Sequence, residues 1–146
     1  MAGEVLDELA LAALQARQEG VERSQVNKLI EYLESTDSFT LILFLVRQVA
    51  RGQWSRAGRH AYSAARLVKV IRRLIEKVSS ENERKEVLRK VLGYFKWFYE
   101  SYDLNRRVVD ELRKVYGQAL NQVFKDPKQT PPRGFAEAYL RALLRI

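Results

Sequence analysis

The chain has 146 residues, of which 47% are apolar and 30% charged, with a formal net charge of +8 and no cysteine. These values are typical of one globular domain that needs no disulfide or metal for stability, and they exclude thiolate chemistry and cysteine-based zinc sites. The longest apolar run, Leu41–Val46, is far shorter than the ~20 residues of a membrane span, so we expect a cytoplasmic protein that does not enter a membrane.

The first half of the sequence has the periodicity of helices rather than strands. An apolar stripe that includes Leu6 and Leu9 predicts a helix over residues 4–19, and a shorter helix is expected over 25–34 with Ser24 as its N-cap. Residues 39–51 are apolar on nearly every side, which is typical of a central helix.

The second half continues the same pattern. A long helix over 55–78 places an apolar face opposite a basic stripe, and a Ser80-x-x-Glu83 capping box begins a helix over 81–102. One more helix is expected over 104–125, before three prolines within residues 126–134 interrupt the chain. We therefore predict an all-α, single-domain bundle of six to seven helices: a bundle over 1–125, a proline-rich linker over 126–134, and a C-terminal helix over 135–146 that packs on the bundle or on a partner.

Positive charge is concentrated in residues 38–75, which contain eight basic side chains and no Asp or Glu. A stretch of this length would hold roughly five acids at the chain's average content. An anionic partner, counterions, or the acidic N-terminal 50 residues can balance this charge. We expect a nucleic acid, because arginine predominates here and its planar fork suits phosphate. The expected contact residues are Arg47, Arg51, Arg56, Arg59, Arg66, Lys69, Arg73 and Lys77.

Aromatic residues gather at the end of the 81–102 helix, where Tyr94, Phe95, Trp97, Phe98 and Tyr102 lie. Most of them are expected in the core, because a soluble protein cannot expose them all. One or two of them, together with Trp54 and Tyr62 near the basic stripe, are candidates for stacking on nucleic-acid bases.

Signals for catalysis are weak. His60 is the single histidine, and no carboxylate lies within helical reach of it, so we interpret it as a bystander. The acidic residues show no metal-binding spacing such as Glu-x-x-His. We expect no metal, no cofactor and no enzymatic activity, although a helical nuclease remains a third hypothesis after nucleic-acid binding and a protein–protein adaptor whose basic face docks on an acidic protein surface.

Three segments, in order, resemble the small subunit of type III-A CRISPR interference complexes. Ser24-Gln25-Val26-Asn27-Lys28 is similar to a Ser-Gln-aliphatic-Arg-basic opening, residues 43–52 to a Leu-Leu-x-Arg…Gly-Arg stretch, and residues 95–102 to an aromatic helix end. Asn27 stands where an arginine is usual, and residues 103–146 have no counterpart. The small subunit of the type III-B complex is a similar candidate.

The resemblance implies a helical bundle without catalysis of its own, whose copies stack along a ribonucleoprotein filament and support the guide–target RNA. Arg47 and Arg51 carry over from the second segment, whereas Arg59, Arg66, Lys69 and Arg73 come from the charge pattern alone. We therefore predict a non-enzymatic subunit of an antiviral ribonucleoprotein that binds nucleic acid, with RNA favoured over DNA, and has other subunits or copies of itself as protein partners.

Overall fold

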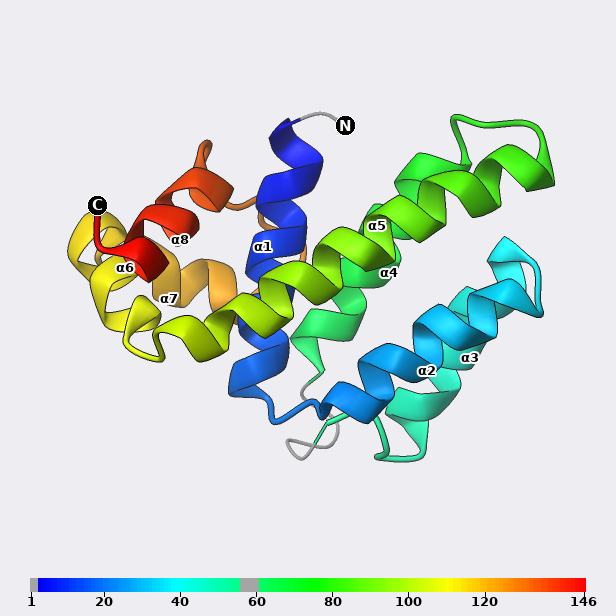
Figure 1. Cartoon of the computed structure of the whole chain (residues 1–146), viewed down its shortest axis with the longest axis horizontal. Coiled ribbons are helices and arrows are strands. Elements are labelled where there is room, and N and C mark those ends of the chain that lie inside the picture. The colour runs from blue at the N-terminus through cyan, green and yellow to red at the C-terminus, as the bar shows by residue number, and fades with distance from the viewer. Residues whose placement is uncertain (1–2, 56–60) are drawn as a thin grey trace.

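The structure is a computed structural model that describes residues 3–55 and 61–146 (Figure 1). Within these ranges it contains eight α-helices, one short 3-10 helix and no strand, which confirms the all-α class. The helices are α1 (Gly3–Gln18), α2 (Arg23–Glu34), α3 (Ser38–Ala50), α4 (Tyr62–Ile75), α5 (Glu81–Ser101), the 3-10 helix (Tyr102–Leu104), α6 (Val108–Tyr116), α7 (Gln118–Lys125) and α8 (Phe135–Leu144).

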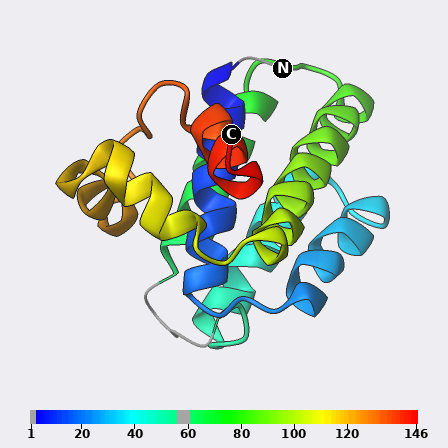
Figure 2. The ribbon, with the colours of Figure 1, turned by 60° about the vertical axis from the view of Figure 1, so that its left-hand side comes forward.

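The first helix, α1, is the centre of the molecule. Every residue from Asp7 to Ala16 is buried, and α1 packs against α4, α5 and α8. Figure 2 shows it in the middle, with α6 and α7 on one side and α5 on the other. The expectation that residues 39–51 form the central helix is wrong, because α3 lies at the edge and exposes part of its apolar surface.

Two apolar cores share α1. One side of it, with Leu9 and Ala13, packs with buried residues of α2, α3, α4 and α5. The other side, with Leu11 and Leu14, packs with buried residues of α6, α7 and α8. The first core therefore joins α2, α3, α4 and α5 to α1, and the second attaches the C-terminal helices α6, α7 and α8 to the same central element.

The expected helix over 104–125 is two helices, α6 and α7, which are separated at Gly117. The backbone of Gly117 has φ 60° and ψ −136°, a conformation that only glycine adopts without strain. The glycine thus lets the chain turn where the apolar pattern continues, and this is why the periodicity of the sequence did not reveal the break.

The N-terminal ends of the helices are capped by side chains that are either close in sequence or come from another helix. Ser80 is confirmed as the N-cap of α5, because its Oγ accepts a hydrogen bond from the backbone N–H of Glu83 at 3.4 Å. Ser24 is not an N-cap, since α2 begins one residue before it. The start of α8 is held from a distance by Asp7 of α1, whose carboxylate accepts the N–H groups of Gly134 at 3.0 Å and Ala136 at 2.8 Å.

The start of α4 is likewise held by a distant carboxylate. Glu19 accepts hydrogen bonds from the N–H of Ser63 at 3.1 Å and from its hydroxyl at 2.5 Å, and the Trp54 indole donates to the same hydroxyl at 3.0 Å. Burial raises the pKa of Glu19, against the lowering effect of the Ser63 hydrogen bonds. In the folded protein, desolvation therefore works against the charged form of this side chain.

We expect the raised pKa of Glu19 to make its contribution to stability decline as pH rises. When the pKa of a carboxyl group is higher in the folded than in the unfolded protein, its contribution to the free energy of unfolding is fully present below the ordinary glutamate pKa, about 4.3. That contribution is lost as pH rises through the folded-state pKa. Urea unfolding of wild type and Glu19→Gln between pH 4 and 7 checks this, since the variant should gain stability relative to wild type as pH rises. Parallel pH profiles for the two proteins would contradict it.

Candidate nucleic-acid interface

Arg66 does not face solvent, so its expected place on an exposed basic stripe is wrong. Its side chain is 0% exposed and forms an ion pair with Glu8 of α1, with 2.7 Å between Nη1 and Oε2. The remaining hydrogen bonds of the guanidinium go to Gln15 Oε1 and to the backbone carbonyls of Val123, Asp126 and Gln129, at 2.8–3.1 Å. All five N–H donors of Arg66 thus have acceptors inside the molecule.

Lys69 is largely occupied by the same neighbours. Its Nζ lies 3.1 Å from Glu8 Oε1 and donates to the Pro127 carbonyl at 3.0 Å, and the side chain is 25% exposed. Glu8 therefore pairs with two cations of α4. For Arg66 and Lys69, the acidic N-terminal part of the chain supplies the negative charge that we had expected from a nucleic acid.

Other cations of the basic stretch remain available to a ligand. Exposed cations that form no ion pair with any described residue are Arg47 of α3, Arg51 directly after it, Arg72 and Arg73 in the last turn of α4, and Lys77 two residues beyond α4. Arg72 is one of the eight basic residues within 38–75 but not one of the expected contact residues. Arg56, Arg59 and His60 lie outside the described residues.

These exposed cations form two groups. The helices α3 and α4 pack together and run in opposite directions (Figure 1). Arg47 and Arg51, here called the α3 cations, lie toward the connection between the two helices. Arg72, Arg73 and Lys77, here called the α4 cations, lie at the far end of α4. The structure therefore does not bring the predicted contact residues onto one surface.

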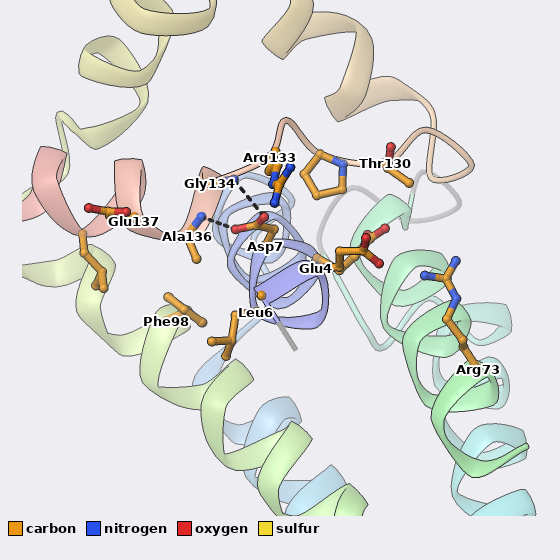
Figure 3. Close-up of a pocket in the computed structure, with 14 residues that line it drawn as sticks. Glu4, Leu6, Asp7, Arg73, Phe98, Thr130, Arg133, Gly134, Ala136 and Glu137 are labelled. Carbon is orange, nitrogen blue, oxygen red and sulfur yellow. Dashed lines mark hydrogen bonds between the residues drawn. The ribbon is translucent and has the colours of Figure 1, made fainter. Parts of the chain in front are cut away.

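A groove of about 1160 Å³ opens beside Arg73. It is lined by the start of α1, residues 130–134, the start of α8 and Phe98 (Figure 3). Arg133 lies in its wall, and in the view of Figure 3 Glu4 appears between Arg133 and Arg73.

Most carboxylates of this groove are already bonded. Asp7 holds the start of α8, Glu8 pairs with Arg66 and Lys69, and Glu137 pairs with Arg141. Among the described residues of the lining, this leaves the cations Arg73 and Arg133 without an ion pair, against one such carboxylate, Glu4. The mouth of the groove therefore carries a positive excess that can hold an anionic group.

The part played by Arg133 was not foreseen from the sequence. It lies in the stretch that we predicted as a linker, 60 residues from Arg73, and no local pattern places the two side chains on one groove. The only sequence signal is that residues 126–134 hold two cations, Lys128 and Arg133, against one acid, Asp126.

The candidate aromatic residues differ in what they can contact. Trp54 is 1% exposed and its indole N–H is bound to Ser63, so it cannot stack on a base. Trp97 of α5 is exposed, and its ring makes an edge contact with Tyr94 at 5.7 Å between centroids. Tyr62 is half-buried on α4, so of the three candidates Trp54, Tyr62 and Trp97 only Trp97 is largely exposed, and it lies on α5 rather than on the basic stretch.

In residues 3–55 and 61–146, no group of three or more His, Asp or Glu side chains is close enough to hold a metal ion. No described helix combines the length and apolar character that a bilayer span requires. Scans against protein-family models and searches of curated proteins and of solved structures give no match.

Proposed function

We propose that this chain is a non-catalytic subunit that binds the phosphate backbone of RNA, and that it acts within a larger ribonucleoprotein. The observation that carries the proposal is the group of α4 cations, which are exposed and unpaired among the described residues, with Arg133 on the adjacent groove. Glu76 is the one acid beside them in the sequence, and it forms no ion pair with them.

The physical basis is counterion release. Neighbouring guanidinium and ammonium groups repel one another in the free protein, and a phosphate chain relieves this repulsion while it releases its own condensed cations. Contacts to phosphate position a strand but do not read its sequence. Four cations make about four phosphate contacts, which predicts a slope of log K against log salt of about −3 for a single strand.

A small number of contacts gives one copy only modest affinity, so function would need several copies or other subunits along the strand. The resemblance to the small subunit of type III-A CRISPR complexes supports such an assembly. Its three segments lie in α2, in α3 and the turn after it, and at the end of α5. A type III ribonucleoprotein is thus the specific form of the proposal.

Reversing the charge of the α4 cations is expected to weaken RNA binding. The triple variant Arg72→Glu, Arg73→Glu, Lys77→Glu should lose at least about tenfold in affinity at 0.1 M salt and about 2 units of salt slope, since each phosphate contact contributes about 0.7. Fluorescence anisotropy with a labelled single-stranded RNA, and with DNA of the same sequence, measures both quantities.

The matched control is Arg106→Glu, Arg107→Glu, Arg113→Glu, which makes the same charge change at exposed positions beside and on α6. It should bind RNA within about threefold of wild type. If the two triple variants lose affinity equally, net charge explains the effect and the α4 surface is not the site. If the α4 variant keeps both affinity and slope, the proposed surface is wrong.

A further inference from the structure

The outer face of α3 is apolar and exposed. Phe39 is 71% exposed, Leu43 58% and Val46 49%, and these residues follow each other at i, i+4 and i+7. The opposite face of α3, with Leu41 and Leu45, is buried in the first core. The helix thus has two apolar sides, and only one of them is covered by the described part of this chain.

The regular spacing of these three residues is typical of a docking surface and not of scattered apolar side chains. Single exposed apolar side chains are common and need no explanation. Three in a row on one helix form a continuous strip, and amphipathic helices bind partners through anchors at these same intervals. We call Phe39, Leu43 and Val46 the α3 strip.

The charges beside the C-terminal end of the α3 strip are positive. Arg47 lies about 80° from Phe39 on the helix projection, and Arg51 lies one turn further along on the same flank. Both are exposed and form no ion pair within the described ranges. The complement of this surface is an apolar strip with carboxylates beside it.

A second copy of the chain supplies this complement poorly. The exposed leucines of α8, Leu140 and Leu144, are followed by Arg141, which pairs with Glu137, and by Arg145, which has no ion pair among the described residues. Contact with the α3 strip would therefore bring Arg145 against the α3 cations. Repulsion between them works against a head-to-tail contact of this kind.

A pair of α3 helices from two copies is a weaker complement, because the carboxylates that it would offer are already bonded within each copy. Packed antiparallel, it would bring the α3 cations toward Asp37 and Glu34 of the other copy. The carboxylate of Asp37 already accepts the N–H and hydroxyl of Thr40 at 2.8 and 2.9 Å. That of Glu34 already pairs with Arg89 at 2.8 Å.

We propose that the α3 strip and the α3 cations dock an acidic amphipathic helix of another protein. Its apolar side chains pack on Phe39, Leu43 and Val46, and its carboxylates pair with Arg47 and Arg51. A stable interface buries about 800 Å² per partner, more than three side chains supply, so the docked helix runs along the whole of α3, about 20 Å. This surface is distinct from the α4 cations, and RNA and the protein partner can bind at the same time.

The test uses two synthetic helical peptides of about 18 residues with leucines at i, i+4, i+7 and i+11. One carries glutamates on the flanks of the apolar strip, and the other carries lysines at the same positions. Fluorescence anisotropy with the full chain should show the glutamate peptide binding at least about tenfold more tightly than the lysine peptide. Arg47→Glu together with Arg51→Glu should reverse this preference.

The matched variants are Phe39→Ser, Leu43→Ser on α3 and Leu140→Ser, Leu144→Ser on α8, both pairs of exposed residues at i and i+4. The α3 pair should abolish peptide binding with helicity unchanged, and the α8 pair should not. The α4 triple variant should bind the peptide like wild type, so failure of the RNA proposal and failure of this one give different results.

Three results would overturn the inference. The first is equal affinity for the two peptides, or no binding of either. The second is unchanged binding by the α3 pair. The third is a wild-type dimer in sedimentation that becomes a monomer in the α3 pair, which would assign the strip to a second copy.

Discussion

Replacing Arg66 with leucine is expected to destabilise the protein by about 3–5 kcal/mol, because it removes one partner of a buried ion pair and leaves the Glu8 carboxylate without its strongest neighbour. The carbonyls of Val123, Asp126 and Gln129 lose their donors in the same substitution. Each buried acceptor left without a partner adds to the cost. Chemical denaturation followed by circular dichroism measures the difference in free energy of unfolding.

Two variants control this result. Arg73→Leu changes the same residue type on the same side of α4 but at an exposed position, and should stay within about 0.5 kcal/mol of wild type. Arg66→Leu combined with Glu8→Leu removes both charges and should recover part of the lost stability. A loss below about 1 kcal/mol for Arg66→Leu alone would show that the guanidinium is not enclosed.

Phe135→Ala is expected to cost about 3–5 kcal/mol, the range for deleting a fully buried aromatic side chain. Phe135 is 0% exposed, begins α8 and lies in the second core, with the Tyr116 ring 5.8 Å away between centroids. Its loss would open a cavity between α8 and the rest of the bundle. The free energy of unfolding from urea titrations checks the prediction.

Phe39→Ala is the matched control, since Phe39 is 71% exposed on α3. It should change stability by no more than about 0.5 kcal/mol. Equal losses of unfolding free energy in Phe39→Ala and Phe135→Ala would contradict the difference in burial between the two side chains. An unchanged stability of Phe135→Ala would mean that α8 is not packed on the second core.

Helices α1 and α5 were predictable because their signals are local, whereas the helix expected over residues 55–78 begins only at Tyr62 and ends at Ile75 as α4. The bounds expected for residues 4–19 and 81–102 differ from α1 and α5 by one residue at most, since apolar spacing and a capping box are read from neighbouring residues. The conformation of Gly117 could not be read in this way, because glycine is compatible both with a helix and with a break.

The candidate site was less predictable because it depends on contacts between distant segments. Val70 lies only about 40° from Arg66 on the helix projection, so the basic stripe borders the apolar face. That border was a usable signal that Arg66 could be buried. No pattern showed that the carbonyls of residues 123–129 would surround it, or that Arg133 would share a groove with Arg73.

The position of α1 between the two cores has a consequence for how the molecule comes apart. Neither core can come apart without exposing one side of α1, and the other core also packs on α1. We therefore expect one two-state transition, with amide hydrogens in α5 and α8 exchanging at similar free energies of opening. A chain that ended after α7 would lose the part of the cover of Leu11 and Leu14 that α8 supplies, and we expect it to aggregate rather than persist as a smaller bundle.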